Sequence, residues 1–323
     1  MKKTSFCLIT FALIASIVYA QSKSTPLIIT STTDICAIAK AIIGDKGEAV
    51  SVMTGGDDPD FIIPHRAAVF RAKEADFFLK NGIGLEEKWE SQLHSEIGNA
   101  EINIGAIGNI VVTSGIDVLP TKSDDGKTKP IIHSKGNPYV WLDWKNGKTI
   151  ASNICEFLCV TYPKWEKEYR ANLSAFNKSL EEGAEEWKKR MEPLKGQKIV
   201  AYQHTFDYFT NKYGLKVVQY LEPAAGIPPT DTQVDNFIKF IKDNKIQLFI
   251  IADYNSRKFP NEIAQETGVE LLVLPASVGD DIIDTYPKLF DQLTKLFKNY
   301  NARNNAKTNK KTSGSNPAKK SAQ

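Results

Sequence analysis

The sequence predicts a two-lobed α/β fold, in which each lobe is a mainly parallel sheet flanked by helices and one long rigid helix bridges the lobes. Two blocks of alternating strand and helix patterns, within residues 27–160 and 198–300, indicate a doubly wound sheet in each half. A charged amphipathic stretch at 165–191 separates them and, as one helix, would be about 40 Å long. A mature chain of about 300 residues also favours two domains over one core.

The N-terminus predicts export. Two lysines precede an uncharged apolar run at 6–18, and a polar chain begins at Gln21. This is the pattern of a cleaved signal peptide over residues 1–20, and the run is too short to span a bilayer comfortably. Cys7 has no lipid-attachment pattern before it. We therefore expect a soluble periplasmic or secreted product rather than a lipoprotein, with an uncleaved anchor as the alternative.

The first lobe, expected over 21–163, opens with a buried strand and a helix that stops at Gly44. The first block predicts strands at 27–30, 49–53 and 76–79, short strands near 102–107 and 110–112, and helices at 34–43, 65–75, 85–97 and 149–160. A turn-rich polar stretch at 121–137 is interpreted as a surface loop, and the chain re-enters the core at 139–143.

The connecting helix is expected within 164–196. Aromatic and leucine residues recur at helical spacing between 165 and 191, surrounded by Glu and Lys, with no proline. A break into two shorter helices at Gly183 is the alternative.

The second lobe, expected over 197–300, repeats the βα pattern. It predicts strands at 198–202, 217–220, 248–252 and 271–274, and helices at 205–213, 231–243, 260–267 and 281–300. Thr230 or Asp231 is the predicted cap of the helix at 231–243.

Charge excludes a broad affinity for nucleic acids. The formal net charge is only +3, and the tail at 301–323 carries six basic residues and no acid. Without that tail the chain is close to neutral, which gives no basic surface of the kind that binds nucleic acids. The Asn-, Lys- and Ser-rich tail itself is predicted to be disordered.

Three cysteines remain after signal removal, namely Cys36, Cys155 and Cys159. An odd number cannot pair fully within the chain. Cys155 and Cys159 share one helix face and could bind a metal, but small core residues are the favoured interpretation.

Six motifs, in order along the chain, resemble one family of bacterial receptors. They are TTD at 32–34, GDDPD at 56–60, AD at 75–76, NGIGLE at 81–86, NPYVWLD at 137–143 and HTFDYFTNKYGL at 204–215. Together they are similar to the TroA-like, ZnuA-type metal receptors of ABC importers, over nearly the whole chain up to about residue 299. The resemblance implies two lobes bridged by one helix and a site built from four loops between them.

The resemblance also implies a function. It predicts a monomeric periplasmic receptor without enzymatic activity, which captures a transition-metal ion and delivers it to the membrane permease of an ABC importer. Two metal histidines of the family fall on Asp60 and Tyr139 here, the third is retained as His204, and the acidic fourth position falls nearest Asp253. These four residues are the predicted metal ligands.

The donor set favours some ions over others. Imidazole suits zinc, whereas carboxylate oxygen suits manganese and iron. A tyrosine binds best as phenolate, which needs a strongly acidic metal because its ordinary pKa is about 10. Asp60, Tyr139, His204 and Asp253 therefore favour iron or manganese over zinc. Tyr139 could instead be a wall residue of a weakened site.

Other polar residues near these motifs could substitute for the lost histidines. His65 and His133 could replace a lost imidazole, although an exposed position is the favoured interpretation of each. His94 is interpreted as solvated, and Glu222 ranks below Asp253 as a carboxylate ligand. His204 follows a buried strand and opens a helix, which is where α/β sheets place ligand-binding groups.

Three other functions remain open. An enzyme could use His204 with Asp207 or Asp253 for acid–base catalysis, but no nucleophile motif and no phosphate-binding glycine loop is present. An adhesin-like protein could have lost its metal site. A related receptor could bind a siderophore or a tetrapyrrole between the same lobes.

Overall fold

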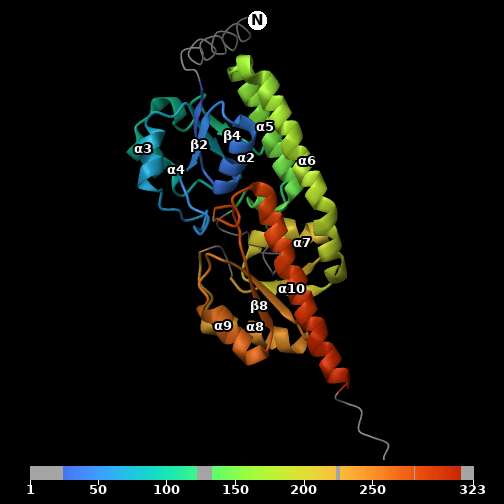
Figure 1. The fold of residues 1–323 in the computed structure, drawn as a ribbon. Coiled ribbons are helices and arrows are strands. Elements are labelled where there is room, and N and C mark those ends of the chain that lie inside the picture. The colour runs from blue at the N-terminus through green and yellow to red at the C-terminus, as the bar shows by residue number, and fades with distance from the viewer. Residues whose placement is uncertain (1–24, 122–132, 223–225, 280, 314–323) are drawn as a thin grey trace, which may run out of the picture.

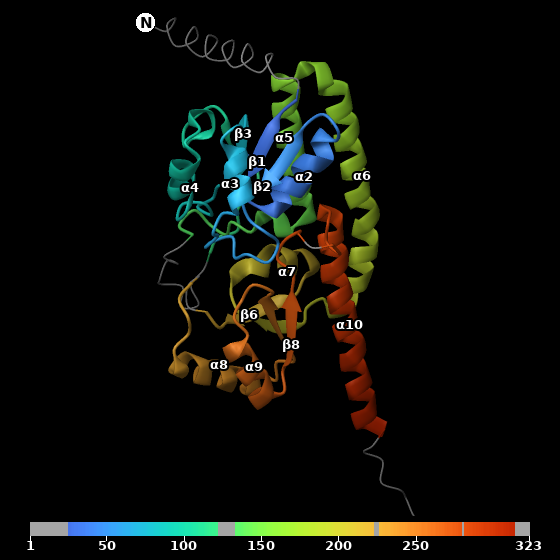
Figure 2. The same cartoon turned by 60° about the vertical axis from the view of Figure 1, so that its left-hand side comes forward.

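The computed structural model describes residues 25–121, 133–222, 226–279 and 281–313. It shows two lobes, with the helix α6 (Glu166–Met191) running beside both of them (Figures 1 and 2). The predicted fold class is therefore confirmed. The predicted signal peptide lies outside the described residues. Within those residues, no helix has the length and apolar character needed to cross a membrane.

The sheet of the first lobe, called the N-lobe below, is wholly parallel, with strand order β2-β1-β3-β4. Its strands are β1 (Leu27–Thr30), β2 (Glu48–Ser51), β3 (Phe77–Lys80) and β4 (Asn109–Val111). Its helices are α2 (Thr33–Ile43), α3 (Arg66–Ala72), α4 (Glu90–Ile97) and α5 (Trp144–Thr161), with 3₁₀ turns at Ala100–Ile102 and Val140–Leu142. These elements follow the predicted order.

The predicted strand at 102–107 is wrong, because this segment folds as a turn. Its apolar residues alternate as they would in a strand. However, Gly105 has a φ of +82°, which ends an extended backbone. Ile104 and Ile107 are 50% and 67% exposed, so the alternation does not mark a buried face.

The sheet of the second lobe, called the C-lobe below, is also parallel, with strand order β6-β5-β7-β8. Its strands are β5 (Lys198–Ala201), β6 (Lys216–Tyr220), β7 (Leu248–Ala252) and β8 (Glu270–Leu274), and its helices include α7 (Asp207–Tyr213), α8 (Asp231–Asp243) and α9 (Lys258–Thr267). Every residue of β7 is buried, as expected for an apolar central strand. Thr230 caps α8 through a capping box with Gln233.

The connecting helix α6 is continuous through Gly183, so the two-helix alternative is wrong. It packs against α2 and α5 in the N-lobe and against α10 (Tyr286–Ser313) in the C-lobe. A Cβ atom at position 183 would lie 2.4 Å from the Trp187 ring. The missing side chain of Gly183 therefore makes room for a buried tryptophan instead of breaking the helix.

The closing helix α10 (Tyr286–Ser313) runs beyond its predicted end at residue 300. Arg303 and Lys307 both pair with Glu270 of β8, at 2.7 and 2.9 Å. These ion pairs hold the additional turns against the C-lobe. Residues 301–313 of the tail that was expected to be disordered are therefore helical, and the remainder lies outside the described residues.

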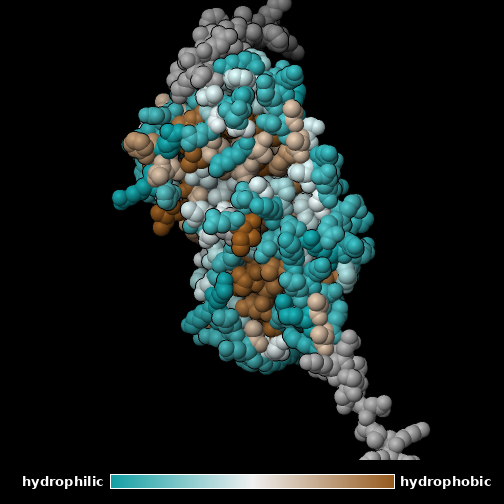
Figure 3. Space-filling view, viewed as in Figure 1, coloured by the Kyte–Doolittle hydropathy of each residue, from teal (hydrophilic) through white to brown (hydrophobic). Residues whose placement is uncertain are grey.

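One apolar core extends through both lobes and α6. It includes Ile28 of β1, Trp141, Tyr169 of α6, Ile250 of β7 and Phe290 of α10. On the face in Figure 3, hydrophilic residues cover the side of α6, and apolar residues gather near β8. The shared core fixes the seam at which loops of the two lobes face each other.

The three cysteines are free and buried in this core. The sulfur atoms of Cys155 and Cys159 lie 3.8 Å apart on α5. Their burial agrees with the prediction that they are core residues.

Candidate functional site

The four predicted site residues all lie in segments at the ends of strands or short helices. Asp60 is in the loop after β2, and Asp253 directly follows β7. His204 opens the 3₁₀ helix His204–Phe206 after β5, and Tyr139 precedes the 3₁₀ helix Val140–Leu142. The loops after parallel strands are the usual place for ligand-binding groups in α/β sheets.

Asp60 and Tyr139 are brought into direct contact. Asp60 is only 1% exposed, and the Tyr139 hydroxyl donates a 2.8 Å hydrogen bond to its Oδ2. His133 Nε2 lies 3.2 Å from Oδ1 and 3.3 Å from Oδ2 of the same carboxylate. The interpretation of His133 as exposed is wrong, because its side chain is buried in this cluster.

Tyr254, which the sequence reasoning missed, connects this cluster to the C-lobe. Its hydroxyl donates to the Tyr139 hydroxyl at 3.4 Å. It accepts a hydrogen bond from Gln203 Nε2 at 2.8 Å and lies 3.0 Å from Thr205 Oγ1. The loops after β5 and β7 therefore reach Asp60 through a chain of hydroxyl groups that crosses the seam.

Both tyrosines are held as neutral phenols. Burial raises the pKa of Tyr139 well above its ordinary value, and the charge of Asp60 adds to that effect. Burial also raises the pKa of Tyr254 well above its ordinary value. A neutral phenol can donate to Asp60, whereas a phenolate at this position requires a cation beside it.

His204 is oriented as a ligand by its own partner. Its Nδ1 lies 2.8 Å from Asp207 Oδ2, and Asp207 Oδ1 accepts from the Tyr220 hydroxyl at 2.8 Å. The imidazole also lies against the Tyr220 ring, with centroids 3.7 Å apart. Because Nδ1 faces a carboxylate, Nε2 keeps its lone pair in the neutral ring. A carboxylate behind an imidazole is the common arrangement around metal-binding histidines.

Asp253 lies in a different environment from Asp60. Its Oδ1 accepts from the backbone N–H of Tyr254 at 3.1 Å, and burial raises its pKa. Asp34 of α2 has a pKa that is raised from 3.8 to about 7, mainly by burial. The charge of Asp253 adds to this rise. Asp34 Oδ1 accepts from the Val278 N–H at 3.1 Å, which joins the lobes at a second point.

The predicted ligands are not assembled around one point. Neither His204 nor Asp253 hydrogen-bonds to Asp60 or Tyr139. Across 25–121, 133–222, 226–279 and 281–313, no three His, Cys, Asp or Glu side chains are grouped closely enough to hold a metal ion. Asp60 therefore contacts Tyr139 directly, whereas His204 and Asp253 are connected to this pair only through adjacent residues. Tyr254, next to Asp253, bonds to Tyr139, and Gln203 and Thr205, on either side of His204, contact Tyr254.

Further acidic side chains lie near Asp60. Burial, followed by the charge of Asp60, raises the pKa of Asp58 to about 6. Burial raises the pKa of Glu222 to about 8, and the charges of Asp58 and Asp60 contribute. Glu222 follows β6 in the C-lobe, so carboxylates of both lobes act on the same region. A bound cation would relieve this repulsion.

Of the remaining histidines, His65 is exposed, as expected. His94 is buried, contrary to its interpretation as solvated, and lies 3.6 Å from Glu90 and 3.3 Å from Asn109 in the N-lobe. Its surroundings on α4 therefore give it a structural role.

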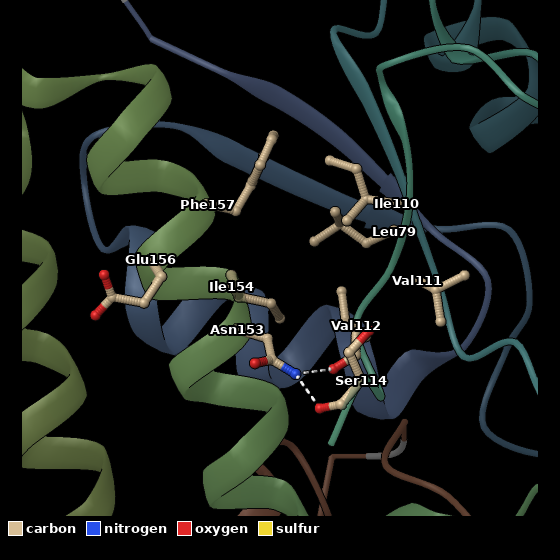
Figure 4. A pocket seen from close by; sticks show the side chains of 9 residues that line it. All are labelled: Leu79, Ile110, Val111, Val112, Ser114, Asn153, Ile154, Glu156 and Phe157. Atoms are coloured by element: carbon tan, nitrogen blue, oxygen red, sulfur yellow. Dashed lines mark hydrogen bonds between the residues drawn. The ribbon is translucent and has the colours of Figure 1, made fainter. Parts of the chain in front are cut away.

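A cavity of about 230 Å³ lies elsewhere, between β4 and α5 (Figure 4). Its lining is mostly apolar, and Asn153 donates to the carbonyls of Val112 and Ser114 there. Glu156 at its edge is paired with Arg170. This lining has no donor set for a metal.

The chain matches a family model described as zinc-uptake complex component A, periplasmic, over residues 28–300. One similar protein is the iron ABC transporter substrate-binding lipoprotein MtsA of Streptococcus pyogenes serotype M1, 27% identical over 253 residues, covering 77% of this chain and 79% of the relative. The manganese ABC transporter substrate-binding lipoprotein PsaA of Streptococcus anginosus is 26% identical over 281 residues, covering 84% and 88%.

Solved structures share the fold. A crystal structure of ZnuA has a TM-score of 0.71 at 23% identity and covers 85% of this chain and 98% of its own. The manganese-bound periplasmic metal binding protein from Candidatus Liberibacter asiaticus has a TM-score of 0.70 at 21% identity and covers 85% and 99%.

Proposed function

Because the chain belongs to the zinc-uptake complex component A family of periplasmic metal receptors for ABC importers, we propose that it captures one transition-metal ion between its lobes. The ion is iron, manganese or zinc, and the receptor delivers it to a membrane permease. The observation that carries this proposal is the buried Asp60 carboxylate at the seam, which is linked to both lobes and lies near two further acidic side chains, Asp58 and Glu222.

The proposed ligands are Asp60, Tyr139, His204 and Asp253. The contact between Asp60 and Tyr139 supports the first two, and the orientation of His204 by Asp207 supports the third. Asp253 has the weakest support, because its charge acts on Asp34. Binding requires that His204 Nε2 moves toward Asp60 and that Tyr139 releases its proton. An acidic ion such as Fe³⁺ favours that release.

We further propose that the receptor acts as a monomer, has no enzymatic activity and is exported by a cleaved signal peptide over residues 1–20. The relatives named above are lipoproteins. Here Cys7 lies within the apolar run at 6–18, which supports release from the membrane.

Metal binding is tested by thermal-shift titration of the mature protein with Mn²⁺, Fe²⁺, Fe³⁺ and Zn²⁺, after removal of bound metal. An ion at 100 times its Kd stabilises the folded form by about 2.7 kcal/mol, which for a chain of this size raises Tm by about 4 °C. Elemental analysis of protein from native cells identifies the cargo.

The matched variants are His204→Ala, which should lose most of the shift, and His65→Ala, which should keep it. His65 is exposed and lies outside the site. If the two variants respond equally, His204 is not a ligand.

An interaction protein with a lost metal site is the second candidate. It is favoured by the absence of a preassembled donor cluster among the described residues, and by the hydrogen bond from Tyr139 that already satisfies Asp60 Oδ2. It predicts that none of the four ions raises Tm and that native protein contains no stoichiometric metal.

A further inference from the structure

His133 is fixed in the seam with one ring nitrogen at the Asp60 carboxylate. The residue is 6% exposed, and its Nε2 lies 3.2 and 3.3 Å from the two carboxylate oxygens. The ring stands edge-on to Tyr139, with centroids 6.2 Å apart and an interplanar angle of 83°. This orientation is set by packing against the same tyrosine that replaces the family's histidine.

We propose that His133 supplies the imidazole that position 139 lacks, so that the captured ion is bound by His133 Nε2 and Asp60 together. The inference rests on the proposed function and adds a ligand that the family resemblance does not provide. On binding, the Nε2–H proton passes to solvent and Nδ1 takes up a proton. The ring therefore stays neutral, with its Nε2 lone pair on the ion.

The distances support this assignment. A nitrogen and an oxygen that bind one ion at about 2.1 Å, with an angle of 90–109° between them, lie about 2.9–3.4 Å apart. The separation of 3.2 Å between His133 Nε2 and Asp60 Oδ1 falls within that range. An ion can therefore enter between these atoms with little movement of either side chain.

The pair itself contains buried polar atoms without described hydrogen-bond partners. Asp60 Oδ1 is close to His133 but is not in hydrogen-bond geometry with any described group, and His133 Nδ1 has no described partner. Glu222 Oε2, on the C-lobe side, is also buried without a described partner. Such atoms are costly to bury unless a ligand satisfies them. A cation would satisfy the oxygens, and an ordered water could satisfy Nδ1.

A second imidazole would change the ion preference. With His133 and His204 both bound, the site has two nitrogen donors, which favours zinc and ferrous iron relative to manganese. Replacing His133 with glutamine should therefore weaken Zn²⁺ and Fe²⁺ binding by more than about 100-fold. Loss of a residue that only orients a ligand typically weakens binding by about 10–100-fold. Mn²⁺ binding should weaken much less. A purely structural role would weaken all three ions equally.

The test uses the four histidines of the chain as separate reporters. Tag-free mature protein is titrated with Zn²⁺ while the ¹⁵N signals of the imidazoles are followed by NMR. We expect the signals of His133 and His204 to move to those of metal-bound rings, and those of His65 and His94 to stay. If His204 responds and His133 does not, the inference is wrong while the proposed function stands.

The affinities of His133→Gln, with His65→Gln as the matched control, are then measured for Zn²⁺, Fe²⁺ and Mn²⁺. The metal-free Tm of each variant confirms that it is folded. An unchanged Zn²⁺ affinity in a folded His133→Gln protein overturns the inference. If the wild-type protein binds none of the three ions, the proposed function fails, and this inference fails with it.

Discussion

Tyr139 shows how one residue alters the seam. A histidine at this position would offer a lone pair, whereas the buried phenol offers a proton, which it donates to Asp60. The seam is consequently closed by hydrogen bonds from Tyr254 through Tyr139 to Asp60. Under the proposed function an ion replaces these bonds, so we expect metal binding to be coupled to opening of this chain of hydroxyl groups.

Asp207 is predicted to control metal affinity through His204. Replacing Asp207 with asparagine removes the charge that fixes Nδ1–H and the ring orientation. Affinity should fall by about 10–100-fold, as is typical for outer partners of a metal histidine. Isothermal titration of Asp207→Asn measures this effect, with the exposed Asp231→Asn as control. Equal affinities in the two variants would show that Asp207 does not orient a ligand.

The sequence located part of this site, and its limits have physical causes. The sequence predicted that Asp60 and Tyr139 share a site, because each lies in a motif, GDDPD or NPYVWLD, that resembles a metal-binding loop of the family. His133 was expected to be exposed because its burial depends on contact with Asp60, which is 73 residues earlier in the chain and leaves no local signal. Tyr254 was missed because Asp253, one residue earlier, has the more familiar ligand chemistry.

The long helix α6 gives the two lobes a common support. Its buried side chains are Tyr169, Phe176, Leu180, Trp187 and Met191. Trp187 packs between Trp144 of α5 and Phe290 of α10, with ring centroids at 6.5 and 5.3 Å. A single tryptophan therefore connects the helices of both lobes, and Gly183 provides the space for its ring.

Gly183→Ala is predicted to destabilise the protein, although alanine is the better helix former. The added methyl meets a Trp187 ring that cannot move away, and such overpacking costs about 1–3 kcal/mol. Urea unfolding measures this cost. In a Trp187→Leu background, the same change should instead stabilise by up to about 1 kcal/mol, through helix propensity. The same sign in both backgrounds would contradict the packing argument.

Element boundaries show where sequence patterns stop being informative. The apolar strand β7 and the capped helix α8 were predicted almost residue by residue, because burial and capping are local. The end of α10 was not, since its last turns depend on the pairing of Arg303 with Glu270, which are far apart in the sequence.

The lobes also meet where Gly55 of the N-lobe approaches Gly279 of the C-lobe. A Cβ atom on Gly55 would lie 2.8 Å from the Gly279 backbone, so the loops of the two lobes touch without side chains between them. Beside this contact, the buried Asp34 carboxylate of the N-lobe accepts from the N–H of Val278. The relative position of the lobes thus depends on a buried acid.

Asp34 predicts how stability varies with pH. Burial raises its pKa from 3.8 to about 7 in the folded protein. Protonated Asp34 therefore contributes to the free energy of unfolding below pH 4. This contribution, at most about 4 kcal/mol, is lost as the pH rises through about 7. Asp34→Asn should flatten the fall in unfolding free energy between pH 5 and 8. Urea unfolding of metal-free protein at both pH values measures this, and an unchanged slope would contradict it.

The most direct test of metal capture between the lobes is a crystal of the mature protein grown with the ion that gives the largest thermal shift and measured near the absorption edge of that ion. We predict one anomalous peak in the seam, within bonding distance of Asp60 and of His204. A fully ordered seam without a peak, in crystals that contain this ion at saturating concentration, would contradict metal capture between the lobes.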